Sequence, residues 1–257
     1  MKTCQKKFQA NSSGQLLIVA ALAIAILISS TTIYVYEVSQ ETSSQDYSSI
    51  SNFVQAIKQS TRNVMISALA NVSNGGEKTV LVVNLNEFSQ TLRSLSHLRT
   101  YHLAFTPLNG SNYDEGTLLS WNTSAIGISS ICASFNLKIY SIAENFTLNY
   151  NVNVTTAITI SGYYTRLLGD EKQVNLTCRV YNEGEPALAK NLTLYYESLG
   201  SWIPTNSSNN LSITDNGNGT YHISFTVSVP SDFVQVSARV YDLRSVFVRA
   251  NITCYEA

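Results

Sequence analysis

Charged residues are scarce in this chain: they make up 13% of its 257 residues, about half the share found in ordinary soluble domains. The formal net charge is -1, so the chain lacks the basic excess by which proteins bind nucleic acid. Serine, threonine and asparagine take the place of the missing charges, as is typical of extracellular surfaces. The composition therefore excludes a nucleic-acid partner and favours an exported protein.

Recognisable catalytic chemistry is missing as well. The three histidines, His97, His102 and His222, have no cysteine or carboxylate cluster beside them that would complete a metal site. The sequence contains no nucleophile elbow, phosphate-binding loop or dinucleotide fingerprint. We therefore expect a protein that is not an enzyme and that binds no metal or cofactor.

A long apolar run stands near the start of the chain. Residues 16–36 carry no charge, and a helix of this length rises about 1.5 Å per residue and so crosses a hydrocarbon core of about 30 Å. Three lysines precede the run and three acidic residues follow it: Lys2, Lys6, Lys7, Glu37, Glu41 and Asp46. This asymmetry predicts a single-pass protein of the cell membrane, in contact with lipid, with a cytoplasmic N-terminus and an extracellular body.

Three kinds of processing fit this leader: an uncleaved anchor, a secretory signal cut after the apolar run, and a cut before the run. A basic leader that ends in Gly14, followed by Gln15 and a Leu/Ile/Ala/Val helix, resembles the class III signal of archaeal type IV pilin-like proteins. The resemblance covers about residues 1 to 70. It implies cleavage between Gly14 and Gln15 by a prepilin peptidase.

The same resemblance implies homo-oligomeric assembly, because pilin-like subunits bundle their apolar helices in the core of a filament. The helix contacts would come from Leu16, Leu17, Val19 and Leu22. The chain departs from the family at Val19, where many pilins carry Glu, and its basic residues lie seven or more positions before the cut.

Helical spacing returns beyond the apolar run, and no proline interrupts residues 15–72. Apolar or small residues recur every three or four positions at Ile50, Val54, Ile57, Thr61, Val64 and Ala68. After the leader (1–14), these patterns predict a transmembrane and amphipathic helix over 15–74, ending at Asn74-Gly75-Gly76. Two helices joined by a polar stalk at 39–49 are the alternative.

Two β-rich units are expected after the helix. Residues 75–154 predict a small α+β head, with a β-branched run at 79–83, a helix over 85–98 and strands over 101–105, 117–121 and 131–139. Residues 155–257 alternate apolar and polar over five strands, which predicts an antiparallel β-sandwich. Turns are predicted at Asn182-Glu183-Gly184, Asn216-Gly217-Asn218-Gly219 and Val229-Pro230. The Gly219-Thr220-Tyr221 entry into a strand is similar to extracellular immunoglobulin-like repeats.

Two of the four cysteines, Cys178 and Cys254, fall on the apolar faces of their strands. Two inward cysteines in one exported domain suggest a disulfide, and two buried free thiols are the alternative. Cys132 lies on the opposite face of its strand from Ala133.

Sequons of the type Asn-x-Ser/Thr are about twice as frequent as chance predicts, which favours N-glycosylation of an exported body. Strands rich in Asn and Thr would produce some of them without function. Besides Asn11, the sites are Asn71, Asn109, Asn122, Asn145, Asn153, Asn175, Asn191, Asn206, Asn210, Asn218 and Asn251.

Two functional hypotheses follow. The first is a non-enzymatic cell-surface structural or adhesive protein, a type IV pilin-like subunit that assembles through its N-terminal hydrophobic helix. The second is a monomeric, membrane-anchored extracellular protein that binds an envelope partner or a glycan. Four aromatic residues are available for such binding, or for the core: Tyr163, Tyr164, Tyr195 and Trp202.

Overall fold

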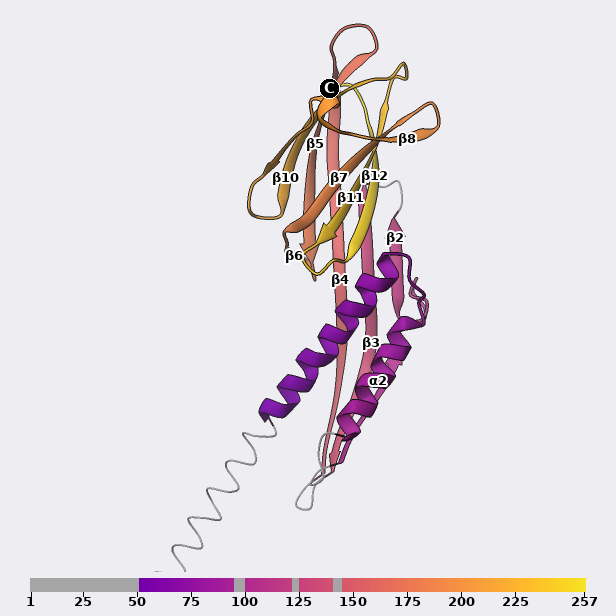
Figure 1. The fold of residues 1–257 in the computed structure, drawn as a ribbon, viewed down its shortest axis with the longest axis vertical. Coiled ribbons are helices and arrows are strands. Elements are labelled where there is room, and N and C mark those ends of the chain that lie inside the picture. Colours follow the sequence, from indigo (N-terminus) through magenta and orange to yellow (C-terminus); the bar gives the residue numbers. More distant parts are fainter. Residues whose placement is uncertain (1–50, 95–99, 122–124, 141–144) are drawn as a thin grey trace, which may run out of the picture. The chain divides into compact units, whose positions relative to one another are not determined.

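The computed structural model describes residues 51–94, 100–121, 125–140 and 145–257 (Figure 1). The chain divides into two compact units, Met1–Ile57 and Lys58–Ala257. Residues 51–57 are the described part of the first unit, and they are helical. The following paragraphs concern the second unit.

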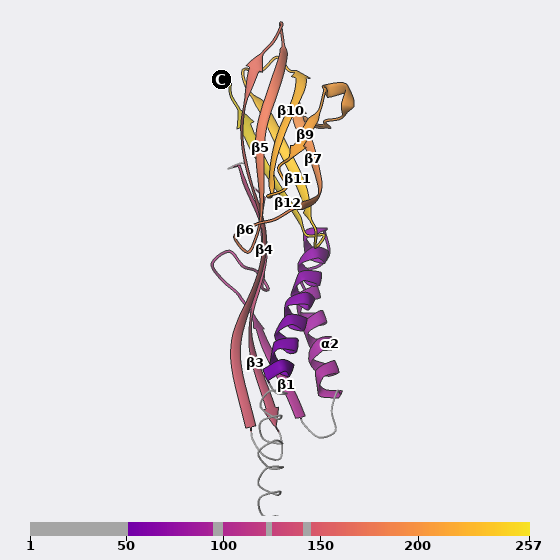
Figure 2. The same cartoon turned by 90° about the vertical axis from the view of Figure 1, so that its left-hand side faces the viewer.

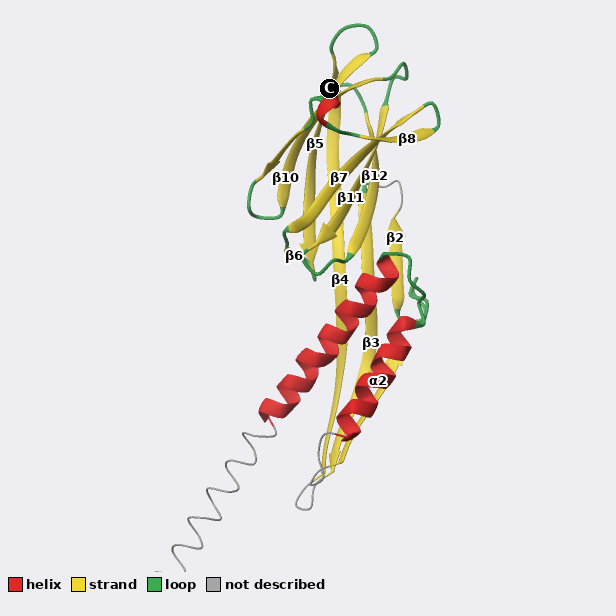
Figure 3. Cartoon of the chain, in the orientation of Figure 1, coloured by secondary structure: helices red, strands yellow, loops and turns green. Residues whose placement is uncertain are grey.

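Antiparallel strands dominate this unit, and helices are few (Figure 3). The helices are residues 51–73, of which 58–73 belong to this unit, α2 (Val80–Ser94) and the short 3-10 helix η1 (Ser207–Asn209). The strands are β1 (Thr100–Pro107), β2 (Thr117–Trp121), β3 (Ile126–Tyr140), β4 (Asn145–Arg166), β5 (Glu171–Asn182), β6 (Glu185–Pro186), β7 (Ala189–Ser198), β8 (Ser201–Pro204), β9 (Ser212–Asp215), β10 (Thr220–Ser228), β11 (Val234–Asp242) and β12 (Phe247–Cys254).

Two sheets contain these strands. The larger has eight strands in the order β1-β3-β4-β5-β10-β9, with β2 paired to β3 and β6 paired to β5. The smaller has four strands in the order β12-β11-β7-β8. Figures 1 and 2 show the smaller sheet over one end of the larger sheet and the helices over its other end.

Strand β4 runs through both ends of the larger sheet. It has 22 residues, so at about 3.3 Å per residue it spans about 70 Å. Its even-numbered side chains share one face: Val152 and Val154 are buried in the half that the helices cover, and Ile158 and Ile160 in the half that the second sheet covers. One continuous strand therefore carries two cores.

The first core lies between the helices and strands β1, β3 and β4. Met65, Ala68, Leu69 and Val72 are buried on the first helix, and Leu81, Leu85, Ser89 and Leu92 on α2. The spacing of three and four residues places each set on one face of its helix. The buried Ser89 hydroxyl donates a hydrogen bond to the Leu103 carbonyl oxygen at 2.8 Å, which ties α2 to β1.

The second core lies between the two sheets. The alternating faces predicted for residues 155–257 all contribute to it, including Val174, Phe225, Val236 and Val248, each 1% exposed or less. Turns confirm the predicted breaks: Glu183 (φ +51°) and Gly184 (φ +89°) form the β5–β6 turn. The strand positions of this region are therefore confirmed.

The predicted fold class is wrong in its leading element. A helix from 15 to 74 was expected, but the described helices are short, and residues 15–50 lie outside the described residues. The predicted stop is confirmed, because the helix ends at Ser73 and Gly75 takes a positive φ of 95°.

The predicted single-pass membrane localisation is likewise overturned. In the part of the chain that the structure describes, no helix combines the length and the apolar character needed to cross a membrane. The run on which that prediction rested, residues 16–36, lies outside the described residues.

Two boundaries also differ from expectation. The helix predicted to begin at residue 85 begins at Val80: residues 80–83 of the β-branched run form the first turn of α2, because Leu81 continues the buried helical stripe of Leu85. The boundary expected between 154 and 155 falls inside β4. The α+β head and the sandwich are therefore built on one sheet.

The predicted disulfide is not formed: Cys178 and Cys254 are buried free thiols. Cys178 lies opposite Ile160 of β4. Cys254 is the last residue of β12, in the smaller sheet. Both thiols thus line the core between the two sheets.

Candidate functional site

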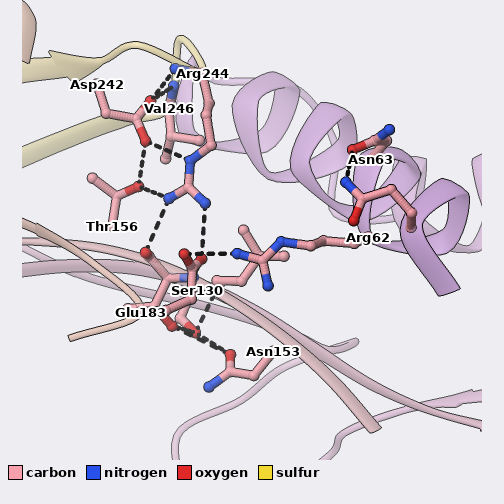
Figure 4. A network of polar contacts seen from close by, with 12 residues as sticks. Arg62, Asn63, Ser130, Asn153, Thr156, Glu183, Asp242, Arg244 and Val246 are labelled. Carbon is pink, nitrogen blue, oxygen red and sulfur yellow. Dashed lines mark hydrogen bonds and ion pairs between the residues drawn. The ribbon is translucent and has the colours of Figure 1, made fainter. Parts of the chain in front are cut away.

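A charged network lies where β4 passes from the helix-covered core to the sheet-covered core (Figure 4). Glu183, in the β5–β6 turn, stands at its centre. Its Oε2 pairs with Arg62 Nη2 of the first helix at 2.8 Å, and its Oε1 pairs with Arg244 Nη1 of the β11–β12 turn at 2.8 Å. One carboxylate therefore joins three elements that are distant in sequence.

Asp242, at the end of β11, is the buried anion of this network, with 0% exposure. Its Oδ2 accepts hydrogen bonds from Arg244 Nε at 2.8 Å and Thr156 Oγ1 at 3.0 Å. Its Oδ1 accepts from the backbone amides of Arg244 and Val246, both at 2.9 Å. Every carboxylate oxygen is thus satisfied, and the turn is held closed from within.

Arg244 links the two anions. Burial by itself would lower the pKa of its guanidinium, but hydrogen bonds to Glu183 and Asp242 raise the pKa above the ordinary value. Nη2 also donates to the Thr155 carbonyl oxygen at 3.1 Å and to Thr156 Oγ1 at 3.0 Å. Two cations and two anions therefore balance, and the network acts as a clamp on β4 rather than as reactive chemistry.

An aromatic cleft of about 460 Å³ opens beside the β11–β12 turn, next to the end of the first helix. Trp121, Tyr241 and Phe247 line it. The centroid of the Phe247 ring lies 5.0 Å from that of the Trp121 ring, in an edge-to-face arrangement, and 5.1 Å from that of the Tyr241 ring. The Phe247 amide donates to Ser73 Oγ at 3.0 Å, which fixes the cleft against the helix end. Partly exposed rings over a hollow can bind an apolar face of a ligand.

A second hollow, the outer groove, has a volume of about 530 Å³ and lies on the solvent face of the larger sheet. Its side chains come from β4, β5, β10 and β9, and most are small and polar. Tyr163 (48% exposed) and His222 are the large ones. The groove is therefore lined by hydroxyl, amide and imidazole groups with one aromatic ring.

The predicted processing and assembly residues, Gly14, Gln15, Leu16, Leu17, Val19 and Leu22, lie outside the described residues, as does the sequon Asn122. Of the other predicted glycosylation sites, Asn175 and Asn251 are partly buried. The exposed ones are Asn71, Asn109, Asn145, Asn153, Asn191, Asn206, Asn210 and Asn218. Exposure of these side chains makes them accessible; their occupancy stays a prediction.

The four aromatic residues proposed for binding do not form one surface. Tyr164 is 1% exposed in the core, and its hydroxyl donates to the Asp232 carbonyl oxygen at 3.0 Å. Tyr163 lies on the larger sheet, whereas Tyr195 and Trp202 lie on the smaller one. Tyr195 stacks under the Arg239 guanidinium at 3.9 Å. The cleft aromatics Trp121, Tyr241 and Phe247 were not predicted.

His102 and His222 are exposed on separate strands, and His97 is outside the described residues. In the ranges that the structure describes, no three His, Cys, Asp or Glu side chains gather in the way that would hold a metal ion.

Sequence reasoning missed the charged network because its members come from separate elements: a helix face, β4, and two turns. The Asn182-Glu183-Gly184 sequence predicts a turn, and nothing in it indicates the charge partners of Glu183.

In comparisons with known proteins, no family model matches the chain, and no match is found among curated proteins.

Proposed function

We propose that this chain is a non-enzymatic structural and adhesive protein of the cell surface, a type IV pilin-like subunit that assembles with copies of itself. The observation that carries the proposal is the clamped passage of β4 between two cores. Helices packed on an antiparallel sheet match the head expected for such a subunit, and the sandwich extends that head along one strand of about 70 Å.

A stiff connection is what a displayed structural module needs. The β3–β4 pair and the β4–β5 pair are hydrogen-bonded along the whole passage, from Tyr140↔Asn145 to Arg166↔Lys172. The network of Arg62, Glu183, Arg244 and Asp242 ties the turns on either side of this passage. Such a connection would transmit force from one core to the other without a hinge.

The test is electron microscopy of cells that express the full chain, with antibodies against residues 155–257. We expect labelled fibres from the natural chain and none from Leu16→Asp. The matched control is Leu168→Asp, which makes the same chemical change at a side chain that is 84% exposed in the β4–β5 turn. Fibres that persist in Leu16→Asp, or surface label without any fibre, would contradict the proposal.

A second candidate function, an extracellular binding protein for a glycan or envelope partner, is favoured by the aromatic cleft. Two rings flank Phe247 there, and the Trp121 indole nitrogen already donates to Ser129 Oγ at 3.0 Å, so the cleft offers aromatic carbon rather than the indole N–H. Asn74 and Lys78 at the rim add polar groups. A sugar can pack its apolar face on an aromatic ring while polar groups at the rim of the cleft bind its hydroxyls.

This candidate is tested by fluorescence. The chain has two tryptophans, so Trp202→Phe leaves Trp121 as the single reporter. Titration with chitin and mannan oligosaccharides should then shift the Trp121 emission, and Tyr241→Ala should abolish the shift. An unchanged spectrum with both oligosaccharides would count against glycan binding in the cleft.

A further inference from the structure

The outer groove consists of two rows of side chains that cross four strands. Register defines the rows: Tyr163 faces Asn175, which faces Ser224, which faces Ser212. The next row crosses the same four strands, and its paired residues are, in order, Ser161, Thr177, His222 and Thr214. The Thr177 hydroxyl lies 3.3 Å from His222 Nδ1.

A sequon occupies the middle of this groove. Asn175, Leu176 and Thr177 form it, with Asn175 and Thr177 on the solvent face and Leu176 4% exposed in the core. Directly opposed residues of an antiparallel pair have Cβ atoms about 5 Å apart, so the Tyr163 ring stands beside the Asn175 amide.

The chemistry of the groove matches the chemistry of a sugar attached at its centre. A pyranose has an apolar C–H face, which packs on an aromatic ring, and a rim of hydroxyls, which exchange hydrogen bonds with serine, threonine and imidazole groups. Tyr163 supplies the ring, and Ser212, Ser224 and His222 supply the polar groups. The hollow of about 530 Å³ surrounds the attachment point rather than lying apart from it.

We propose that the outer groove is the seat of an N-linked glycan on Asn175, whose first sugars lie over Tyr163 and along the strands β5, β10 and β9. The groove is therefore filled by the chain's own modification. This inference rests on the proposed cell-surface function, since N-glycosylation requires export.

The other sequons give the contrast. Asn109 and Asn218 each adjoin a turn glycine, Gly110 and Gly217, whose missing side chain would meet no atom within 4 Å. Glycans at those turns would extend into solvent. Asn175 is the sequon whose side chain lines the outer groove, and it faces an aromatic side chain across the strand pair.

The experiment is site-resolved glycopeptide mass spectrometry on the full chain purified from its own cells, combined with hydroxyl-radical oxidation of the folded protein. We expect sugar on Asn175, and oxidation of Tyr163 that rises severalfold in Asn175→Gln. The matched control, Asn218→Gln, should leave Tyr163 oxidation at the natural level. Tyr255, which is 65% exposed and outside the groove, serves as the internal reference.

The outcomes separate this inference from the function on which it rests. Sugar on Asn109 or Asn218 with an unmodified Asn175 overturns the glycan seat and leaves the exported function standing. Sugar on Asn175 with equal Tyr163 oxidation in the natural chain and in Asn175→Gln also overturns the seat. Absence of sugar from every sequon counts against both the seat and the export that it requires.

Discussion

The two ends of the larger sheet bury the same kind of strand surface under different covers. In the half of β4 from 145 to 154, helices cover Val152 and Val154; in the half from 156 to 166, a second sheet covers Ile158 and Ile160. The strand itself does not change its period or its face. The comparison teaches that a period-2 apolar face determines which side chains of a strand are buried. The rest of the chain determines whether helices or a second sheet bury them.

The most direct way to break this comparison is to damage each core separately. Phe225→Ala in the sheet-covered core and Leu137→Ala in the helix-covered core should each cost about 3 to 4 kcal/mol, because both residues are 2% exposed or less and leave cavities. We expect both variants to shift one common urea transition, because residues 58–257 form one compact unit.

The measurement uses two probes in a Trp121→Phe background: far-UV circular dichroism for the helices and Trp202 fluorescence for the smaller sheet. Coincident midpoints in both variants would support the single unit. If Phe225→Ala moved only the fluorescence transition, the two cores would be independent, and the clamp on β4 would have little energetic role.

The next largest effect is expected at the clamp itself. Asp242→Ala removes the anion that satisfies Arg244 Nε, Thr156 Oγ1 and two backbone amides, so it leaves buried donors unpaired. The expected loss is about 3 kcal/mol in the free energy of unfolding, measured by urea denaturation. Asp242→Asn, which keeps the shape and part of the hydrogen bonding but removes the charge, should lose less; no loss at all in Asp242→Asn would show that charge has no part in the clamp.

Burial of two thiols predicts a pH effect specific to the sheet-covered core. Desolvation raises the pKa of Cys178 and of Cys254 from 9.0 to about 12. The folded chain therefore keeps both protons at a pH where the unfolded chain loses them. Their stabilising contribution is complete below pH 9 and is lost as pH rises towards 12.

At one pH unit above the unfolded pKa the expected loss is about 1.4 kcal/mol for each thiol. Urea unfolding between pH 8 and pH 10 should show it, and Cys178→Val should reduce the slope (about half, if the two thiols contribute equally). Thiol titration adds a control: the two cysteines should react only after unfolding. If two thiols fail to react even in denaturant, Cys178 and Cys254 form a disulfide, and no pH effect from these thiols is expected.

Much of the sheet-covered core could be predicted because its strands alternate strictly. In β10 and β11, every second residue from Tyr221 to Val227 and from Val234 to Val240 is apolar, and these residues are buried. A period of two is compatible with only one regular structure, so the assignment did not depend on tertiary context.

The helix-covered core was less predictable because its local patterns are ambiguous. Residues 80–83 are four consecutive apolar residues, which fit a buried strand or a helix equally well, and only packing of Leu81 with the stripe of Leu85 and Leu92 decides for the helix. In β4 the alternation runs without a break from Val152 through Ile158, so the sequence pattern does not mark the point at which the second sheet takes over from the helices. The charged network was hidden for another reason: each member alone is an ordinary turn or helix-surface residue.

The smallest expected effect separates the exposed arm of the network from its buried arm. Arg62 and Arg244 both pair with Glu183 at 2.8 Å, but the Arg62 side chain is 38% exposed and that of Arg244 is 17% exposed. Water screens the Arg62 pair, and Glu183 keeps its other partner when Arg62 is removed. Arg62→Met should therefore cost only about 0.5 kcal/mol in urea denaturation. Lys78→Met, which breaks the more exposed Lys78–Asp114 pair, is the matched control and should show no measurable change.

A double-mutant cycle of Arg62→Met with Glu183→Gln measures the coupling energy between the two side chains directly. A coupling as large as the loss in Asp242→Ala would mean that the helix is held to the sheet by charge rather than by its buried stripe of Met65, Leu69 and Val72.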